Sequence, residues 1–250
     1  GIVRLEGDIY DAVADHVNAQ LAYARSDRSI VAVVLKVNSP GGGVTASESL
    51  YYSILSFREH KPLVVSIDTM AASGGYYAAS AGDYLFAKPS SSIGNIGVVS
   101  FLPTPSFVDE ELIATGPFKL FGSPRSSYIR EMEMLKQGFL RAVTAQRRDE
   151  LQVDEEILSR GEIYVGIRAL DIGLIDGIGT LTDAVEKAAE MAKVTHYETI
   201  EMNTIPGLEP PNPPLFLSTG GQSPGGQESR RRVPTPGLYY LSLTPGEVSW

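Results

Sequence analysis

Alternating strands and helices are predicted by the pattern of apolar and polar positions along the first 203 residues. Four short apolar runs are predicted as strands: 2–5, 30–35, 62–67 and 84–87. The second and third runs are nearly unbroken and rich in β-branched residues, as is typical of strands buried on both faces of a parallel sheet.

Helices are predicted between these strands. Asp8 can cap a helix whose apolar positions recur at every fourth residue through Leu21. Thr45 and Glu48 have the spacing of a capping box, which predicts a helix start there. Two later helices are predicted at 127–150 and 180–193, the second starting near Thr182. The alternation predicts an α/β fold, with a mainly parallel sheet in layers with flanking helices.

The chain changes character near residue 204. Residues 1–203 have the periodicity of one folded domain, whereas residues 204–250 form a tail rich in proline and glycine. A segment of that composition cannot bury a core of its own. Within the tail, residues 238–243 alone have the content of a strand. Two alternatives stay open: a disordered linker, or a strand that docks on a sheet edge or near a substrate groove.

Charge and rare residues exclude several classes of function. The 250 residues carry a net charge of −9, which disfavours nucleic-acid binding. There is no cysteine, which excludes a disulfide scaffold, a cysteine nucleophile and a cysteine-ligated metal. The three histidines, His16, His60 and His196, lack the spacing of a metal site. We therefore predict neither a metal nor another cofactor. No apolar stretch approaches the about 18 residues of a membrane-spanning helix.

Candidate chemistry lies in two glycine-rich turns that follow buried strands. Residues 38–43 form the first turn, whose glycines let backbone N–H groups approach a ligand. The second places Ser73 between a strand and a short alanine-rich helix, followed by Gly74 and Gly75. There, the hydroxyl could act as a nucleophile and the Gly74 N–H could face an oxyanion. The alternative is that Ser73 only caps the helix.

A nucleophilic Ser73 needs a base. None of the three histidines follows Ser73 in a loop that could return to it. Lys119 lies among apolar and aromatic residues. Burial there would lower the pKa of a lysine from about 10.4 toward neutrality, and a neutral amine can accept the serine proton. The alternative is an amphipathic lysine that covers apolar surface.

Together these motifs resemble the signal peptide peptidase A family, serine peptidases of the ClpP/crotonase fold. The likeness covers about residues 1–195, and the four motifs in this order are specific. The segments that carry it are 38–44, 72–77, 92–98 and 116–119, with supporting matches at 122–125, 160–164 and 169–176.

By this resemblance Ser73 is the nucleophile and Lys119 the general base. Gly42 and Gly74 are then the donors of the oxyanion hole. Asn95 stands where the family usually has a serine that orients the lysine, and an amide oxygen can also accept a hydrogen bond from the amine. The spacing from Ser73 to Lys119 is shorter than in the family, and residues 100–105 replace part of a helix.

The resemblance implies a serine endopeptidase that cuts apolar or unfolded segments, such as remnant signal peptides. The alternatives are a non-proteolytic acyl-thioester enzyme and a peptide-binding scaffold on the same fold. Family members assemble rings whose active sites are completed by neighbours, which implies a homo-oligomer. The family is usually membrane-associated, with the peptidase domain outside the cytoplasm, and for this chain membrane contact is expected only through any anchor that precedes residue 1.

Overall fold

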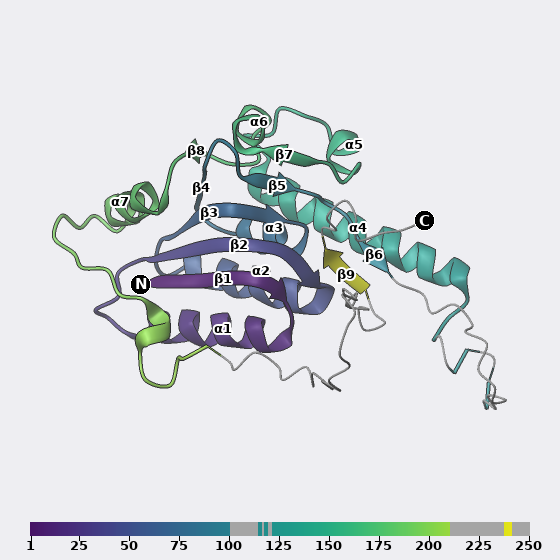
Figure 1. Ribbon diagram of the computed structural model, residues 1–250, viewed down its shortest axis with the longest axis horizontal. Helices are drawn as coiled ribbons and strands as arrows, with labels where there is room; N and C mark the ends of the chain where they lie inside the picture. The colour runs from purple at the N-terminus through teal and green to yellow at the C-terminus, as the bar shows by residue number, and fades with distance from the viewer. Residues whose placement is uncertain (101–114, 117, 120–121, 211–237, 242–250) are drawn as a thin grey trace, which may run out of the picture.

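The computed structural model describes residues 1–100, 115–116, 118–119, 122–210 and 238–241, and its centre is a mainly parallel sheet (Figure 1). The strands are β1 (Ile2–Ile9), β2 (Val33–Gly43), β3 (Leu63–Ala72), β4 (Tyr84–Ala87), β5 (Ser92–Gly94), β6 (Val99–Ser100), β7 (Ile163–Val165), β8 (Gly177–Ile178) and β9 (Leu238–Leu241). Their order is β6-β9-β2-β3-β4-β8, with β1 on β2, β5 on β3 and β7 on β5. Only the pairs that involve β7 or β9 are antiparallel among these strands.

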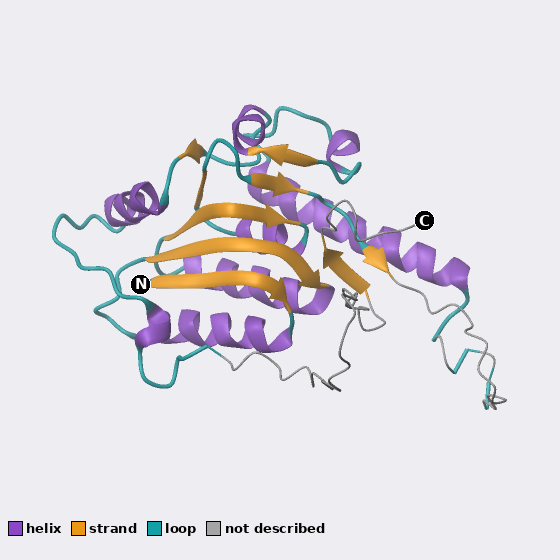
Figure 2. Ribbon diagram, in the orientation of Figure 1, coloured by secondary structure: helices purple, strands orange, loops and turns teal. Residues whose placement is uncertain are grey.

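Helices flank both faces of the sheet (Figure 2). They are α1 (Asp11–Ser26), α2 (Val44–Arg58), α3 (Gly74–Ala79), α4 (Arg125–Arg147), α5 (Glu155–Leu158), α6 (Gly166–Asp171), α7 (Leu181–Met191) and the 3-10 helix η1 (Met202–Thr204). Successive strand residues face opposite sides, so Val33 and Leu35 join the main core with α1 to α4, whereas Val34 packs with α7. The predicted α/β fold with a mainly parallel sheet is confirmed.

Two predicted helix starts are wrong, one of them too early along the chain and the other too late. Helix α1 begins at Asp11 rather than at Asp8, since β1 pairs with β2 as far as Ile9. Helix α2 begins at Val44, before the predicted cap Thr45, and has no side-chain cap, so the predicted capping box does not form. Residues 38–43, predicted as a turn, form the end of β2.

A capping box does form at α7. There Thr180 is the N-cap and Asp183 the reciprocal partner, so this helix begins close to the predicted start near Thr182. The residues of this capping box are not paired in a strand, because β8 ends at Ile178, before Thr180.

The tail contributes strand β9, Leu238–Leu241, which lies within the expected segment 238–243. The sequence analysis predicted that residues 100–105 replace part of a helix of the family. Of these, residues 101–105 lie outside the described residues. In the described ranges, no helix combines the length and the apolar composition needed to cross a membrane.

Candidate active site

Ser73 lies where β3 ends and α3 begins. Its backbone adopts φ 51° and ψ −124°, a conformation that favours glycine and that clusters at functional sites in other residues. The Ser73 N–H donates to the Gly94 carbonyl at 2.8 Å, which holds this turn against β5. The side chain makes no capping hydrogen bond, so the helix-cap alternative is wrong. Ser73 is only 1% exposed.

Helix α3 is a rigid platform behind Ser73, because all six of its residues are buried. The Tyr76 hydroxyl donates to the Leu174 carbonyl at 2.8 Å, and burial raises the pKa of Tyr76, so this phenol stays neutral. The Tyr77 ring stacks on Tyr51 with centroids 4.7 Å apart. These contacts fix the start of the helix and therefore the position of Ser73.

The two glycine-rich turns are in direct contact. A Cβ at Gly75 would lie 2.6 Å from the Ser39 carbonyl oxygen, so a larger residue would push α3 away from β2. Ser39 organises the first turn: its hydroxyl donates to the Gly7 carbonyl at 2.7 Å and accepts from the Gly41 N–H at 3.1 Å. We did not predict this role for Ser39, although serine at the start of a turn often bonds nearby backbone.

The expected oxyanion-hole donors flank this contact. Gly42 is the penultimate residue of β2, and Gly74 is the first residue of α3. An N–H in the first turn of a helix has no partner inside the helix, so the Gly74 N–H can donate to a ligand. The packing of α3 against β2 brings the two segments together, and the donor roles stay predictions.

Asn95 is held next to this turn by two hydrogen bonds. Its N–H donates to the Glu162 carbonyl at 2.8 Å, and its Nδ2 donates to the Gly161 carbonyl at 2.7 Å. The preceding residue, Gly94, pairs with Ala72 and receives the Ser73 N–H. Because Nδ2 is the bonded donor, the Oδ1 atom is left as the acceptor that a lysine-orienting role requires.

Lys119 is exposed in a turn in which its N–H donates to the Gly116 carbonyl at 3.2 Å. Phe118 beside it is 45% exposed, so the part of this segment that the structure describes does not enclose Lys119; Pro117, Leu120 and Phe121 lie outside the described residues. Among the residues that the structure describes, neither Lys119 nor any histidine is hydrogen-bonded to Ser73. The Ser73 turn is therefore formed without a hydrogen bond to the expected base among the described residues.

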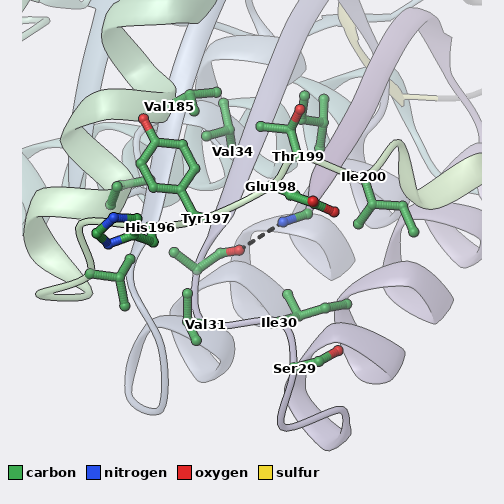
Figure 3. A pocket seen from close by; sticks show the side chains of 16 residues that line it. Ser29, Ile30, Val31, Val34, Val185, His196, Tyr197, Glu198, Thr199 and Ile200 are labelled. Atoms are coloured by element: carbon green, nitrogen blue, oxygen red, sulfur yellow. Dashed lines mark hydrogen bonds between the residues drawn. The ribbon is translucent and has the colours of Figure 1, made fainter.

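A cavity of about 800 Å³ lies at the other end of the sheet (Figure 3). Its wall includes Gly1, Ala32 and Val34 at the amino ends of β1 and β2, and His196 from the segment after α7. Ser73 instead follows the carboxyl end of β3, the edge where ligands of open parallel sheets bind. This cavity is therefore separate from the candidate active site.

Comparisons with known proteins decide the family. The model of Peptidase family S49 matches residues 56–195, and the Clp protease model matches residues 1–93. The chain belongs to peptidase family S49. The resemblance to the signal peptide peptidase A family is thereby confirmed.

Several relatives of this S49 chain carry protease names. "Protease 4" of Haemophilus influenzae is 34% identical over 212 residues, covering 76% of this chain and 34% of the relative. "Protease 4" of Salmonella typhi is 34% identical over 198 residues, covering 73% of this chain and 32% of the relative. "Serine protease SPPA, chloroplastic" of Arabidopsis thaliana is 29% identical over 196 residues, covering 73% of this chain and 29% of the relative. The chain thus matches about a third of the length of these relatives.

The S49 site contains a glycine that we expect to tolerate no side chain. A Cβ at Gly42 would lie 2.0 Å from the Ile9 carbonyl oxygen, so Gly42→Ala must displace β1 from β2. We expect a loss of about 1–3 kcal/mol in the free energy of unfolding, together with lower activity. Gly43→Ala is the matched control, because its nearest neighbour would be at an ordinary 3.7 Å. Equal urea midpoints for both variants would contradict this account.

Proposed function

We propose that this S49 chain is a serine endopeptidase in which Ser73 is the nucleophile. The observation that carries the proposal is the backbone of Ser73, held at positive φ between β3 and α3 with its hydroxyl unused by the helix. Such a strand-to-helix turn presents a hydroxyl beside free backbone N–H groups. The nearby glycine turn of β2 supplies the second half of an oxyanion hole.

The proposed reaction is acyl transfer to serine. The Ser73 hydroxyl attacks the peptide carbonyl while its proton passes to the neutral amine of Lys119. The Gly42 and Gly74 N–H groups stabilise the oxyanion as it forms. The lysine then returns the proton to the leaving amine, and water hydrolyses the acyl-enzyme. No metal or cofactor is required for this sequence.

The proposed substrates are apolar or unfolded segments, such as remnant signal peptides. A peptide bound as an extended strand can pair through its main chain with the glycine end of β2, so an unfolded segment suits the site better than a folded domain. The protein is proposed to be membrane-associated, with its peptidase domain outside the cytoplasm.

A homo-oligomer is part of the proposal, because Lys119 is exposed and, among the described residues, is not hydrogen-bonded to Ser73 of its own chain. An exposed lysine can enter the site of a neighbouring copy, where contact with that copy would remove it from solvent. The Ser73–Lys119 dyad is then completed between two copies of the chain.

Asn95 is proposed to orient that lysine through Oδ1. Asn95→Ala should lower kcat/KM by roughly tenfold to a hundredfold, because a small misplacement of a reacting group can cost up to about a hundredfold, and it should shift the pH profile. Asn95→Ser should recover most of the rate, because a serine hydroxyl is also an acceptor. If Asn95→Ala leaves both the rate and the pH profile unchanged, Asn95 has only a structural role in its turn and does not orient the lysine.

Two substrates separate the proposal from its alternatives. The parent chain is incubated in parallel with an apolar fluorogenic peptide and with an acyl thioester. Hydrolysis of the peptide with no thioester turnover is the expected result. Thioester turnover alone would favour the acyl-thioester enzyme, and binding of the peptide without turnover would favour a scaffold.

A further inference from the structure

Strand β9 of the tail lies between the end of β2 and β6. Tyr239 is opposite Gly43 of β2 on one side and Val99 of β6 on the other, and both pairings are antiparallel. Figure 1 shows β9, in yellow, beside the end of β2. Both edges of β9 are thus taken up by main-chain pairing.

Strand β9 pairs with the same edge of β2 as β3 does, just beyond the point where β3 ends at the proposed nucleophile Ser73. The β3 strand pairs with β2 as far as Ser39, and β9 takes over on β2 from Gly41 to Gly43. The opposite edge of β2 is occupied by β1 through Gly42, so β9 and β3 share one edge. Ser73 follows the last residue of β3, and β9 also contacts α3, the helix that Ser73 begins.

The pairing direction brings the carboxyl end of β9 toward Ser73. Leu241 is opposite Gly41, the residue of this pairing nearest to the end of β3, whereas Tyr239 is opposite the more distant Gly43. The segment therefore enters the site as an extended strand, with its uncharged sequence Leu-Tyr-Tyr-Leu alongside the expected oxyanion donor Gly42.

One strand edge pairs with one strand at a time. A peptide substrate that pairs with Gly41–Gly43 needs the same main-chain groups that β9 uses, and it also needs the space that β9 fills beside β6. We infer that the tail strand Leu238–Leu241 occupies the substrate's strand position and competes with substrate, so that the chain restrains its own activity. This inference rests on the proposed function.

Proline at Tyr239 tests the competition in the full chain. Tyr239 is flanked by strands on both sides, so whichever way its N–H points, Tyr239→Pro removes a group that faces a partner strand. A tail docked about nine-tenths of the time weakens apparent substrate affinity about tenfold. Tyr239→Pro should therefore lower KM for an apolar peptide about tenfold with kcat unchanged. Ser229→Pro, in the tail outside β9, is the matched control and should leave KM at the parent value.

A binding measurement separates this inference from the proposed chemistry. In a Ser73→Ala background, we would measure by fluorescence anisotropy the affinity for a labelled peptide with the sequence of residues 238–243. Adding Tyr239→Pro should tighten binding about tenfold relative to adding Ser229→Pro. This result would support the competition even if every variant proved inactive, which would overturn only the proposed function. Equal peptide affinities of the Ser73→Ala/Tyr239→Pro and Ser73→Ala/Ser229→Pro double variants would overturn the inference.

Discussion

Ser73→Ala is expected to abolish peptide hydrolysis, lowering kcat by a factor on the order of 10⁴ or more. In the proposed mechanism the hydroxyl is the attacking group, and alanine cannot form the acyl-enzyme. The fold should be unaffected, because the Ser73 side chain makes no capping hydrogen bond and Ser73 sits at a turn fixed by its backbone. Initial rates on an apolar fluorogenic peptide and thermal unfolding would be measured side by side.

Ser90→Ala is the control for this variant, since Ser90 is an exposed serine in the loop after β4. It should retain the parent's activity and melting temperature. Comparable turnover by Ser73→Ala and Ser90→Ala would remove Ser73 from the mechanism.

Lys119→Ala is expected to be nearly as damaging, because members of one catalytic unit act together rather than additively. Lys119→Arg should not restore the rate, since a guanidinium keeps its proton near neutral pH. Lys136→Ala, which removes a surface ion pair with Glu133 on α4, is the control and should keep its activity. Substantial hydrolysis by Lys119→Arg would contradict a lysine base.

Mixing the two inactive variants tests where the base comes from. If each site combines Ser73 of one copy with Lys119 of another, a mixture of Ser73→Ala and Lys119→Ala chains should regain activity after joint refolding. Each variant alone should stay inactive under the same treatment. A mixture that stays inactive while its chains exchange would place both residues of the dyad in a single copy.

Local sequence signals were sufficient for the central strands β1 to β4 and for the turn at Ser73. Buried parallel strands are continuous apolar runs, and Leu63–Ala72 is followed at once by the Ser73 turn, so strand and candidate site could be predicted together. The length of β2 could not, because residues 38–43, predicted as a turn, are held extended by pairing with the separate strands β1 and β9.

The same limit applies to the parts of the site that depend on distant segments. The bonds from Asn95 to Gly161 and Glu162 join parts of the chain that no local pattern connects. For Lys119, apolar neighbours in sequence suggested burial, yet its exposure is decided by which segments pack on it. Strand character at 238–243 was visible in the sequence, but its partners β2 and β6 were not.

The most direct test of the nucleophile is covalent labelling. The parent chain would be treated with a serine-reactive fluorophosphonate, digested and mapped by mass spectrometry, with Ser73→Ala treated in parallel. The account predicts one modified site, Ser73, and no labelling of the variant. Labelling at another serine, or equal labelling of parent and variant, would contradict the assignment of Ser73 as the nucleophile.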